Sequence, residues 1–239
     1  MKNVFLKLVW ILFISLILLG VPRIAGLFAD QFNYANIDPD GAFAWISIHH
    51  IVQALLLLPV MFILARNKNY NFGFSLGNKK VGLYFVRLFA KIFAAYILVS
   101  LIIVYLAGTF NTFPYPLTSR NILGQLGFQL FLSGPSEELI FRAFAITMLF
   151  LYIKGSFFKG KLSSANIIAA VIFALAHVRF EFFPFSLSYD PFQLVYAAAL
   201  GLAYGICYER SKSMIYPMIM HSMSNVVAVG VSILAGFIL

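Results

Sequence analysis

Long apolar runs separated by short polar connections make up most of the chain. Each run is long enough, or nearly so, for a helix that crosses the hydrocarbon core of a bilayer, which needs about 20 residues. Backbone groups cannot stay unpaired in lipid, and the runs are too long and too continuously apolar for barrel strands, so we expect helices. The pattern predicts an all-α polytopic transmembrane bundle of about seven helices, in residues 5–27, 42–65, 81–108, 122–153, 164–177, 191–208 and 214–239.

Composition supports this assignment and narrows it. The chain has 239 residues, of which 62% are hydrophobic and 10% charged, with a mean hydropathy of +0.93; a soluble domain has about 25% charged residues. The predicted crossings leave no room for a separate soluble domain. We therefore expect residues 1–239 to form a single integral membrane domain, with more variable helices in residues 1–121 and the chemistry in residues 122–239. Cys207 is the only cysteine, which excludes an intrachain disulfide.

The net charge of +9 does not indicate a nucleic-acid partner, because the basic residues lie between the apolar runs and form no patch of their own. Their distribution instead predicts topology, since cytoplasmic loops are enriched in Lys and Arg. Basic connections alternate with connections that hold acidic residues or a single Arg, which predicts an amino terminus inside and a carboxyl terminus outside. The basic positions are Lys2, Lys7, Arg66, Lys68, Lys79, Lys80, Lys154, Lys159, Lys161, Arg210 and Lys212; the opposite side has Asp30, Asp38, Asp40, Arg120, Arg179, Glu181 and Asp190.

Charged residues interrupt the fourth apolar run, where Glu137, Glu138 and Arg142 lie within six positions. A charge near the middle of a membrane helix costs roughly 2.5 to 3.5 kcal/mol on insertion scales, so such residues normally face a protein or water interior and have a function. Glu138 and Arg142 are four residues apart on one helical face and can pair. Glu137 is offset by about 100° and remains free to face a cavity. Gly134 and Pro135 just before it weaken the helical hydrogen bonds and can admit water.

Two histidines and an asparagine recur in equally apolar surroundings. From the cytoplasmic end of each segment, Glu137 is expected at a depth of roughly 21 Å, His177 at roughly 20 Å, His221 at roughly 11 Å and Asn225 at roughly 17 Å, at 1.5 Å of rise per residue. His221 and Asn225 are four apart and share a face. The sequence therefore permits one buried polar site built from three helices.

These residues carry a resemblance to a known family. The chain resembles the CAAX protease and bacteriocin-processing (CPBP/Abi) family of intramembrane endopeptidases, and in particular its type II CAAX prenyl endopeptidases. That family has the motifs EExxxR, FxxxH and HxxxN in separate helices and in this order. Here they are Glu137-Glu138-Leu-Ile-Phe-Arg142, Phe173-Ala-Leu-Ala-His177 and His221-Ser-Met-Ser-Asn225. The resemblance covers about residues 134–226.

The resemblance implies a glutamate-dependent peptide hydrolase without a cofactor. Glu137 would act as the general base on a water molecule, and His177 would help to hold or activate that water. His221 and Asn225 would donate hydrogen bonds to the oxyanion, while Glu138 and Arg142 would support the helix. The substrate would be a membrane-associated peptide or protein, of the CAAX type or a bacteriocin or pheromone precursor, and no nucleic acid is implied.

Other functions remain open from the sequence. The Glu–Arg pair alone is compatible with a structural lock between helices, and His177 and His221 with core histidines. A zinc protease using two histidines and a glutamate is the second enzymatic hypothesis, although no HExxH spacing supports it. A transporter or proton relay would use the same residues as an ion pathway, and a non-catalytic bacteriocin-immunity protein is a third possibility.

Two further features of the sequence are assigned no catalytic role. His49 and His50 match no motif, and we assign them to packing or to a contact with the lumen. The aromatic residues in 180–185 are interpreted as lipid-facing or interfacial. The short loops and cytoplasmic positive charge suit a multi-pass protein of a bacterial inner membrane.

Overall fold

The structure is a computed structural model of the whole chain. It describes residues 2–182 and 184–238. Phe183 of the aromatic stretch, Leu239 at the end of the last run, and the side chains of the charge markers Lys2 and Glu181 therefore lie outside the described residues.

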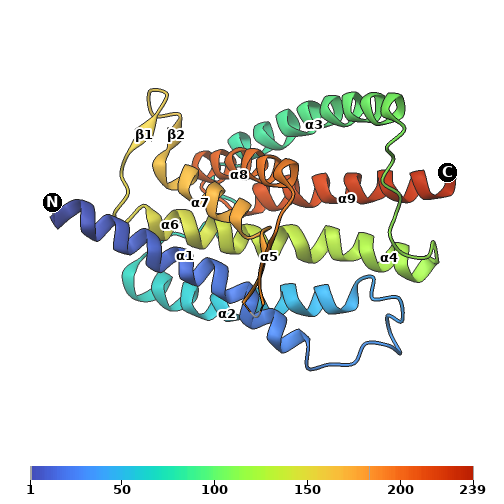
Figure 1. Cartoon of the computed structure of the whole chain (residues 1–239). Coiled ribbons are helices and arrows are strands. Elements are labelled where there is room, and N and C mark those ends of the chain that lie inside the picture. The colour runs from blue at the N-terminus through green and yellow to red at the C-terminus, as the bar shows by residue number, and fades with distance from the viewer. Residues whose placement is uncertain (1, 183, 239) are drawn as a thin grey trace.

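All seven predicted runs contain helix within the described residues, and the chain is an all-α polytopic bundle apart from two short hairpins. The helices lie side by side along one direction, with the two termini at opposite ends (Figure 1). Six runs each form one helix: α1 (Lys2–Ala29), α2 (Ala44–Lys68), α3 (Lys79–Ala107), α7 (Ser164–Leu175), α8 (Pro191–Ser211) and α9 (Ile215–Ile238).

The fourth run is one continuous helical stretch over residues 119–149 in which the hydrogen-bond pattern changes four times. In order it consists of α4 (Ser119–Phe128), the π-helical η1 (Gln129–Ser133), α5 (Gly134–Glu138), the π-helical η2 (Leu139–Phe144) and α6 (Ala145–Leu149). Extra residues in π turns rotate the side chains that follow, and such turns are frequent at functional sites. Both glutamates lie in α5, between the two π-helical stretches.

The fifth run is shorter as a helix than the sequence suggested. With 12 residues, α7 rises only about 18 Å, less than the roughly 30 Å of a hydrocarbon core. The chain then forms the antiparallel hairpin of β3 (Arg179–Phe182) and β4 (Phe185–Ser188), which runs across the helices rather than along them (Figure 1). A second hairpin, of β1 (Ser156–Phe157) and β2 (Leu162–Ser163), precedes α7.

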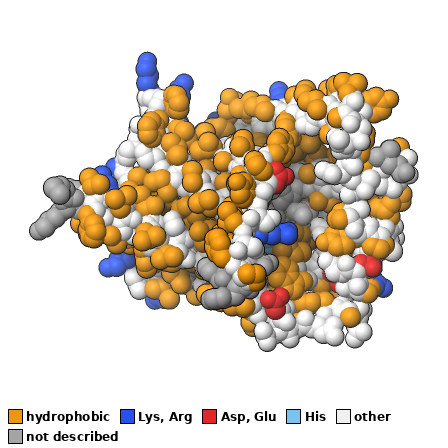
Figure 2. Space-filling model, in the orientation of Figure 1, with side chains coloured by type: hydrophobic (Ala, Val, Ile, Leu, Met, Phe, Trp, Pro, Cys, Tyr) orange, Lys and Arg blue, Asp and Glu red, His pale blue; other side chains and the backbone are white. Residues whose placement is uncertain are grey.

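The outer surface is consistent with lipid. Among the described residues, α1, α2, α3, α8 and α9 are long and apolar enough to span a membrane. Figure 2 shows hydrophobic side chains over most of one face, with Lys and Arg mainly toward the end that holds the amino terminus, and a hollow near the centre of that face. The protein is therefore an integral membrane protein, and the polar residues that it buries lie inside the bundle.

Small residues bring the functional helices close together. A Cβ atom added to Gly134 of α5 would lie 2.8 Å from the backbone nitrogen of Ser222 in α9, and one added to Gly201 of α8 would lie 3.2 Å from the Cβ of Ala170 in α7. Close approach at small residues is how membrane helices gain packing energy without a hydrophobic driving force. Because it has no side chain, Gly134 thus allows the two helices that carry Glu137 and His221 to approach closely.

The connection before α2 is anchored by Asp38, which gives a pH-dependent prediction. Its buried carboxylate accepts hydrogen bonds from the backbone nitrogens of Ala42, Phe43 and Ala44 at 2.8, 2.6 and 2.7 Å. Burial by itself would raise the pKa of the Asp38 carboxyl, but these three donors and the charge of Arg120 outweigh it and lower the pKa below its ordinary value.

We expect Asp38→Asn to destabilise the protein by about 1 to 2 kcal/mol at neutral pH, the size of a lost helix cap. A lowered folded-state pKa contributes stability above the unfolded value near 4 and loses it as the pH falls through the folded value. Thermal unfolding in detergent should therefore show a gap between wild type and Asp38→Asn that closes only below about pH 4. A gap that persists unchanged at pH 2 would contradict this explanation.

Candidate active site

The first motif forms the predicted ion pair. Arg142 Nε lies 3.1 Å from Glu138 Oε2, and both side chains are fully buried. None of the guanidinium nitrogens of Arg142 makes a well-directed hydrogen bond with a described residue. The contact with Glu138 is therefore an electrostatic ion pair without a directed hydrogen bond. The pairing of Glu138 with Arg142 inferred from their spacing is confirmed.

Aromatic rings complete the surroundings of Arg142. Its guanidinium carbon lies 4.3 Å from the ring centroid of Phe173 and 5.5 Å from that of Tyr204, within the range of cation–π attraction. Phe173, the first residue of the second motif, also packs edge-on against His177 at 5.0 Å and against His221 at 6.0 Å. One phenylalanine therefore contacts the arginine and both histidines of the motifs.

Glu138 binds a second partner as well as Arg142. His221 Nδ1 lies 2.8 Å from Glu138 Oε1. Since the carboxylate only accepts hydrogen bonds, Nδ1 of His221 carries a proton and donates it. The ring is further held by stacking on Tyr204, with centroids 5.1 Å apart. Glu138 thus links α5 both to Arg142 and to α9.

Glu137, unlike Glu138, lines a cavity of about 280 Å³. Its side chain is 19% exposed, whereas that of Glu138 is fully buried. The cavity is also lined by His177, His221 and Asn225. The structure therefore brings the glutamate, both histidines and the asparagine from three helical segments around one space.

Hydrogen bonds orient the other two polar groups. His177 Nδ1 lies 2.9 Å from the carbonyl oxygen of Phe173 and donates to it, which leaves Nε2 of the neutral ring as an acceptor. Asn225 Nδ2 donates one hydrogen bond to Ser133 Oγ at 3.0 Å, which leaves its second N–H available. The cavity thus contains an acceptor nitrogen and an amide donor in addition to the carboxylate.

A further histidine lies beside Glu137. His50 on α2 has Nε2 3.8 Å from Glu137 Oε1, while His221 Nε2 lies 3.7 Å from Glu137 Oε2, so two imidazoles flank the carboxylate. The sequence pattern indicates only packing or a lumen contact for His50. A usable signal was present, because His50 and Gln53 are polar residues one turn apart in an apolar run, but nothing in the sequence connected them to the motifs.

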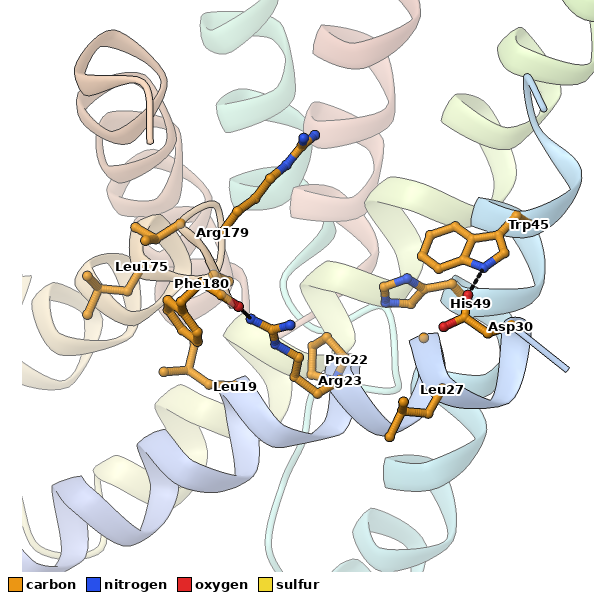
Figure 3. A pocket seen from close by; sticks show the side chains of 13 residues that line it. Leu19, Pro22, Arg23, Leu27, Asp30, Trp45, His49, Leu175, Arg179 and Phe180 are labelled. Carbon is orange, nitrogen blue, oxygen red and sulfur yellow. Dashed lines mark hydrogen bonds between the residues drawn. The ribbon is translucent and has the colours of Figure 1, made fainter. Parts of the chain in front are cut away.

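A larger cavity of about 750 Å³ adjoins the site. Figure 3 shows Arg23 of α1, Trp45 and His49 of α2, and Phe180 around it. Adjacent residues of α2 line the two cavities, His49 the large one and His50 the small one.

Two arginines, Arg23 and Arg179, line this larger cavity. Arg23 donates to the carbonyl oxygen of Phe180 at 2.8 Å and lies over its ring at 4.8 Å. Neither arginine forms an ion pair with a carboxylate among the described residues. At the other side, Asp30 accepts a hydrogen bond from Trp45 Nε1 at 2.7 Å. The cavity lining therefore carries two arginines and one aspartate, with Arg23 beside Phe180.

Metal binding was the second hypothesis for these residues. Within the described part of the chain, no group of three His, Cys, Asp or Glu side chains has the geometry of a metal site. His221 makes a specific contact with a protein partner through Nδ1, the bond to Glu138.

Comparison with known proteins agrees with the resemblance carried by the motifs. The protein-family model described as "Type II CAAX prenyl endopeptidase Rce1-like" matches residues 119–227. The comparison with curated proteins gave no match, and neither did the comparison with solved structures. The matched region contains all three motifs and the cavity-lining residues Glu137, His177, His221 and Asn225. Residues 119–227, somewhat less than half of the chain, are therefore similar to the Rce1-like CAAX endopeptidases, which is consistent with the family that the motifs indicate.

Proposed function

We propose that the protein is an intramembrane endopeptidase in which Glu137 activates a water molecule. The observation that carries this proposal is the position of Glu137, the partly exposed carboxylate in a cavity that it shares with His177, His221 and Asn225. Glu138, one residue away, is fully buried and already bound to Arg142 and His221. Of the two glutamates, only Glu137 is free to meet a substrate.

The reaction follows from the groups in the cavity. Glu137 takes one proton from water as the oxygen adds to the carbonyl carbon of the scissile peptide bond. His177 Nε2, left as an acceptor by the bond from Nδ1 to Phe173, holds the same water. When the tetrahedral intermediate collapses, the C–N bond breaks and Glu137 returns its proton to the leaving amine. The water oxygen stays on the new carboxyl group.

Asn225 and His221 stabilise the oxyanion of the intermediate. Asn225 offers its second amide N–H. His221 donates through Nε2 when its ring is doubly protonated, and the carboxylate of Glu138 at 2.8 Å stabilises that cation. Two carboxylates, one guanidinium and one imidazolium then sum to zero charge, which lowers the cost of burying them in a membrane.

The substrate is proposed to be a peptide that extends from the small cavity into the large one. The small cavity, at about 280 Å³, is below the roughly 300 to 1,000 Å³ of ordinary ligand sites, so it holds only the reacting bond. The large cavity of about 750 Å³ has apolar walls, and its two arginines form no ion pair with a carboxylate among the described residues. A CAAX-type peptide, with apolar residues and a terminal carboxylate, fits both features.

Replacing Arg23 with Gln should raise the KM for a lipid-anchored peptide with a free terminal carboxylate by about tenfold or more, as expected when a charged hydrogen bond is lost. The same peptide with an amidated terminus should be cleaved equally by wild type and Arg23→Gln. Arg87→Gln, a charge change on α3 outside the cavity, is the matched control. Equal KM values for the free acid in wild type and Arg23→Gln would exclude Arg23 from substrate binding.

The function itself is tested by comparing the membrane peptides of cells that carry the wild-type protein or Glu137→Gln. Peptides that accumulate uncut only with Glu137→Gln are the substrates, and they should be cut by the purified wild-type protein in liposomes. Exhaustive chelation should leave this cleavage intact; loss of cleavage on chelation would favour the zinc protease. An ion flux that disappears with Glu137→Gln, without any cleavage, would favour transport. We place the protein in a bacterial inner membrane, as its short loops suggest.

A further inference from the structure

His50 and two neighbours form a closed polar network beside Glu137. His50 is buried, and its Nδ1 lies 2.7 Å from Ser136 Oγ and 2.9 Å from Gln53 Nε2. Gln53 Nε2 also donates to Ser136 Oγ at 2.9 Å. His50 and Gln53 belong to α2, outside the region that matches the family, whereas Ser136 directly precedes Glu137.

This network determines which ring nitrogen of His50 carries the proton. The amide nitrogen of Gln53 only donates, so Nδ1 of His50 must accept. The Ser136 hydroxyl can donate to Nδ1 at 2.7 Å or to the carbonyl oxygen of Ser133 at 3.3 Å, and either choice leaves Nδ1 without a proton. The neutral ring therefore carries its proton on Nε2, the nitrogen that faces Glu137 Oε1.

The two histidines that flank Glu137 consequently differ. His221 donates from Nδ1 to Glu138, so its Nε2 carries a proton only when the ring is doubly protonated. His50 presents an N–H without taking up a proton. Before water is activated, His50 is thus the neutral donor next to the ionised carboxylate. The distance of 3.8 Å exceeds that of a hydrogen bond, but catalytic contacts are often long without substrate and shorten when it binds.

We propose that His50 is a positioning residue for the reaction: its Nε2–H holds one oxygen of Glu137, which leaves the other oxygen to receive the proton of the water, and Gln53 and Ser136 fix the tautomer. This inference rests on the proposed role of Glu137 as the base. It also gives α2, a helix outside the family match, a direct part in the catalytic site.

The test compares His50→Leu with His50→Gln by steady-state cleavage of the peptide identified above. His50→Leu should lower kcat about 10- to 100-fold with unchanged KM, the effect of losing one hydrogen bond to a charged group. His50→Gln keeps an N–H donor and should recover most of this loss. Gln53→Leu removes one of the two groups that fix the tautomer, so it should lower kcat by less than His50→Leu.

The neighbouring histidine is the matched control. Figure 3 shows His49 at the large cavity, close to Trp45 and Asp30, and it makes no ion-pair contact with Glu137 among the described residues. Any effect of His49→Leu should therefore appear in KM and not in kcat. Thermal unfolding of each variant in detergent separates catalysis from folding.

Two results would overturn the inference: wild-type kcat in His50→Leu, or a kcat for His50→Gln as low as that of His50→Leu when both unfold at the wild-type temperature. If His50→Leu does not fold, the kcat values of His50→Gln and Gln53→Leu test the inference. If His50 has only a structural role, both variants should have the wild-type kcat. Cleavage that persists in Glu137→Gln would instead remove the proposed base itself.

Discussion

Replacing Glu137 with Gln should abolish peptide cleavage, with kcat lower by about 10² to 10⁴, the contribution of a positioned general base. The glutamine has nearly the same shape but cannot take a proton from water. Glu137 is partly exposed in its cavity, its side chain makes no hydrogen bond with a described residue, and its contacts with His221 and His50 are 3.7 and 3.8 Å long, so the fold should tolerate the change. The measurement is single-turnover cleavage of a lipid-anchored peptide by protein in liposomes.

The control for this substitution is Asp40→Asn, which changes an exposed carboxylate that binds Asn121 and does not line the cavity. It removes the same charge and should leave kcat at the wild-type value. Thermal unfolding of Glu137→Gln should match that of the wild-type protein. Cleavage by Glu137→Gln at the wild-type rate would eliminate Glu137 as the base.

Removing either partner of the Glu138–Arg142 pair should have the largest effect on stability. Both side chains are fully buried, and Arg142 has no other carboxylate within ion-pair distance among the described residues. A buried charge left without its partner typically costs about 3 to 5 kcal/mol. We therefore expect Arg142→Gln and Glu138→Gln to lower the free energy of unfolding in detergent by this amount, and Glu138→Gln also to release His221.

The double variant Glu138→Gln/Arg142→Gln separates pairing from simple loss of volume. Since it leaves no unpaired charge, it should be less destabilised than the sum of the two single variants. Additive losses in this cycle, or a cost below about 1 kcal/mol for Arg142→Gln, would show that the pair is not what holds α5 in place.

Much of the site was predictable because spacing along a helix determines direction. Glu138 and Arg142 are four residues apart and pair, and Glu137 is rotated away from them into the cavity, as its offset indicated. The runs that were too apolar for a soluble domain are helical, with ends within a few residues of the predicted limits. Local periodicity and the cost of burying charge were sufficient for these inferences.

Other features depended on contacts between distant segments. Nothing in the sequence placed His50 next to Ser136 and Glu137, which are separated from it by 86 positions or more. The sequence analysis also gave no role to Arg23, whose guanidinium meets Phe180 across the larger cavity. The second partner of Glu138, His221, depends on the close approach of α5 and α9 at Gly134.

The amino-acid sequence alone specified a membrane bundle, the pairing of Glu138 with Arg142, and the set of polar residues that had to avoid lipid, because each follows from local spacing and from the high free energy of charge in hydrocarbon. Only the tertiary structure decided which polar groups share a cavity, which nitrogen of each histidine carries its proton, and that α2 contributes to the site. These features depend on helix packing. The π turns determine how the side chains of a helix are rotated, and small residues determine how closely two helices approach. A shift of a few ångströms in a side chain is enough to change its hydrogen-bond partners.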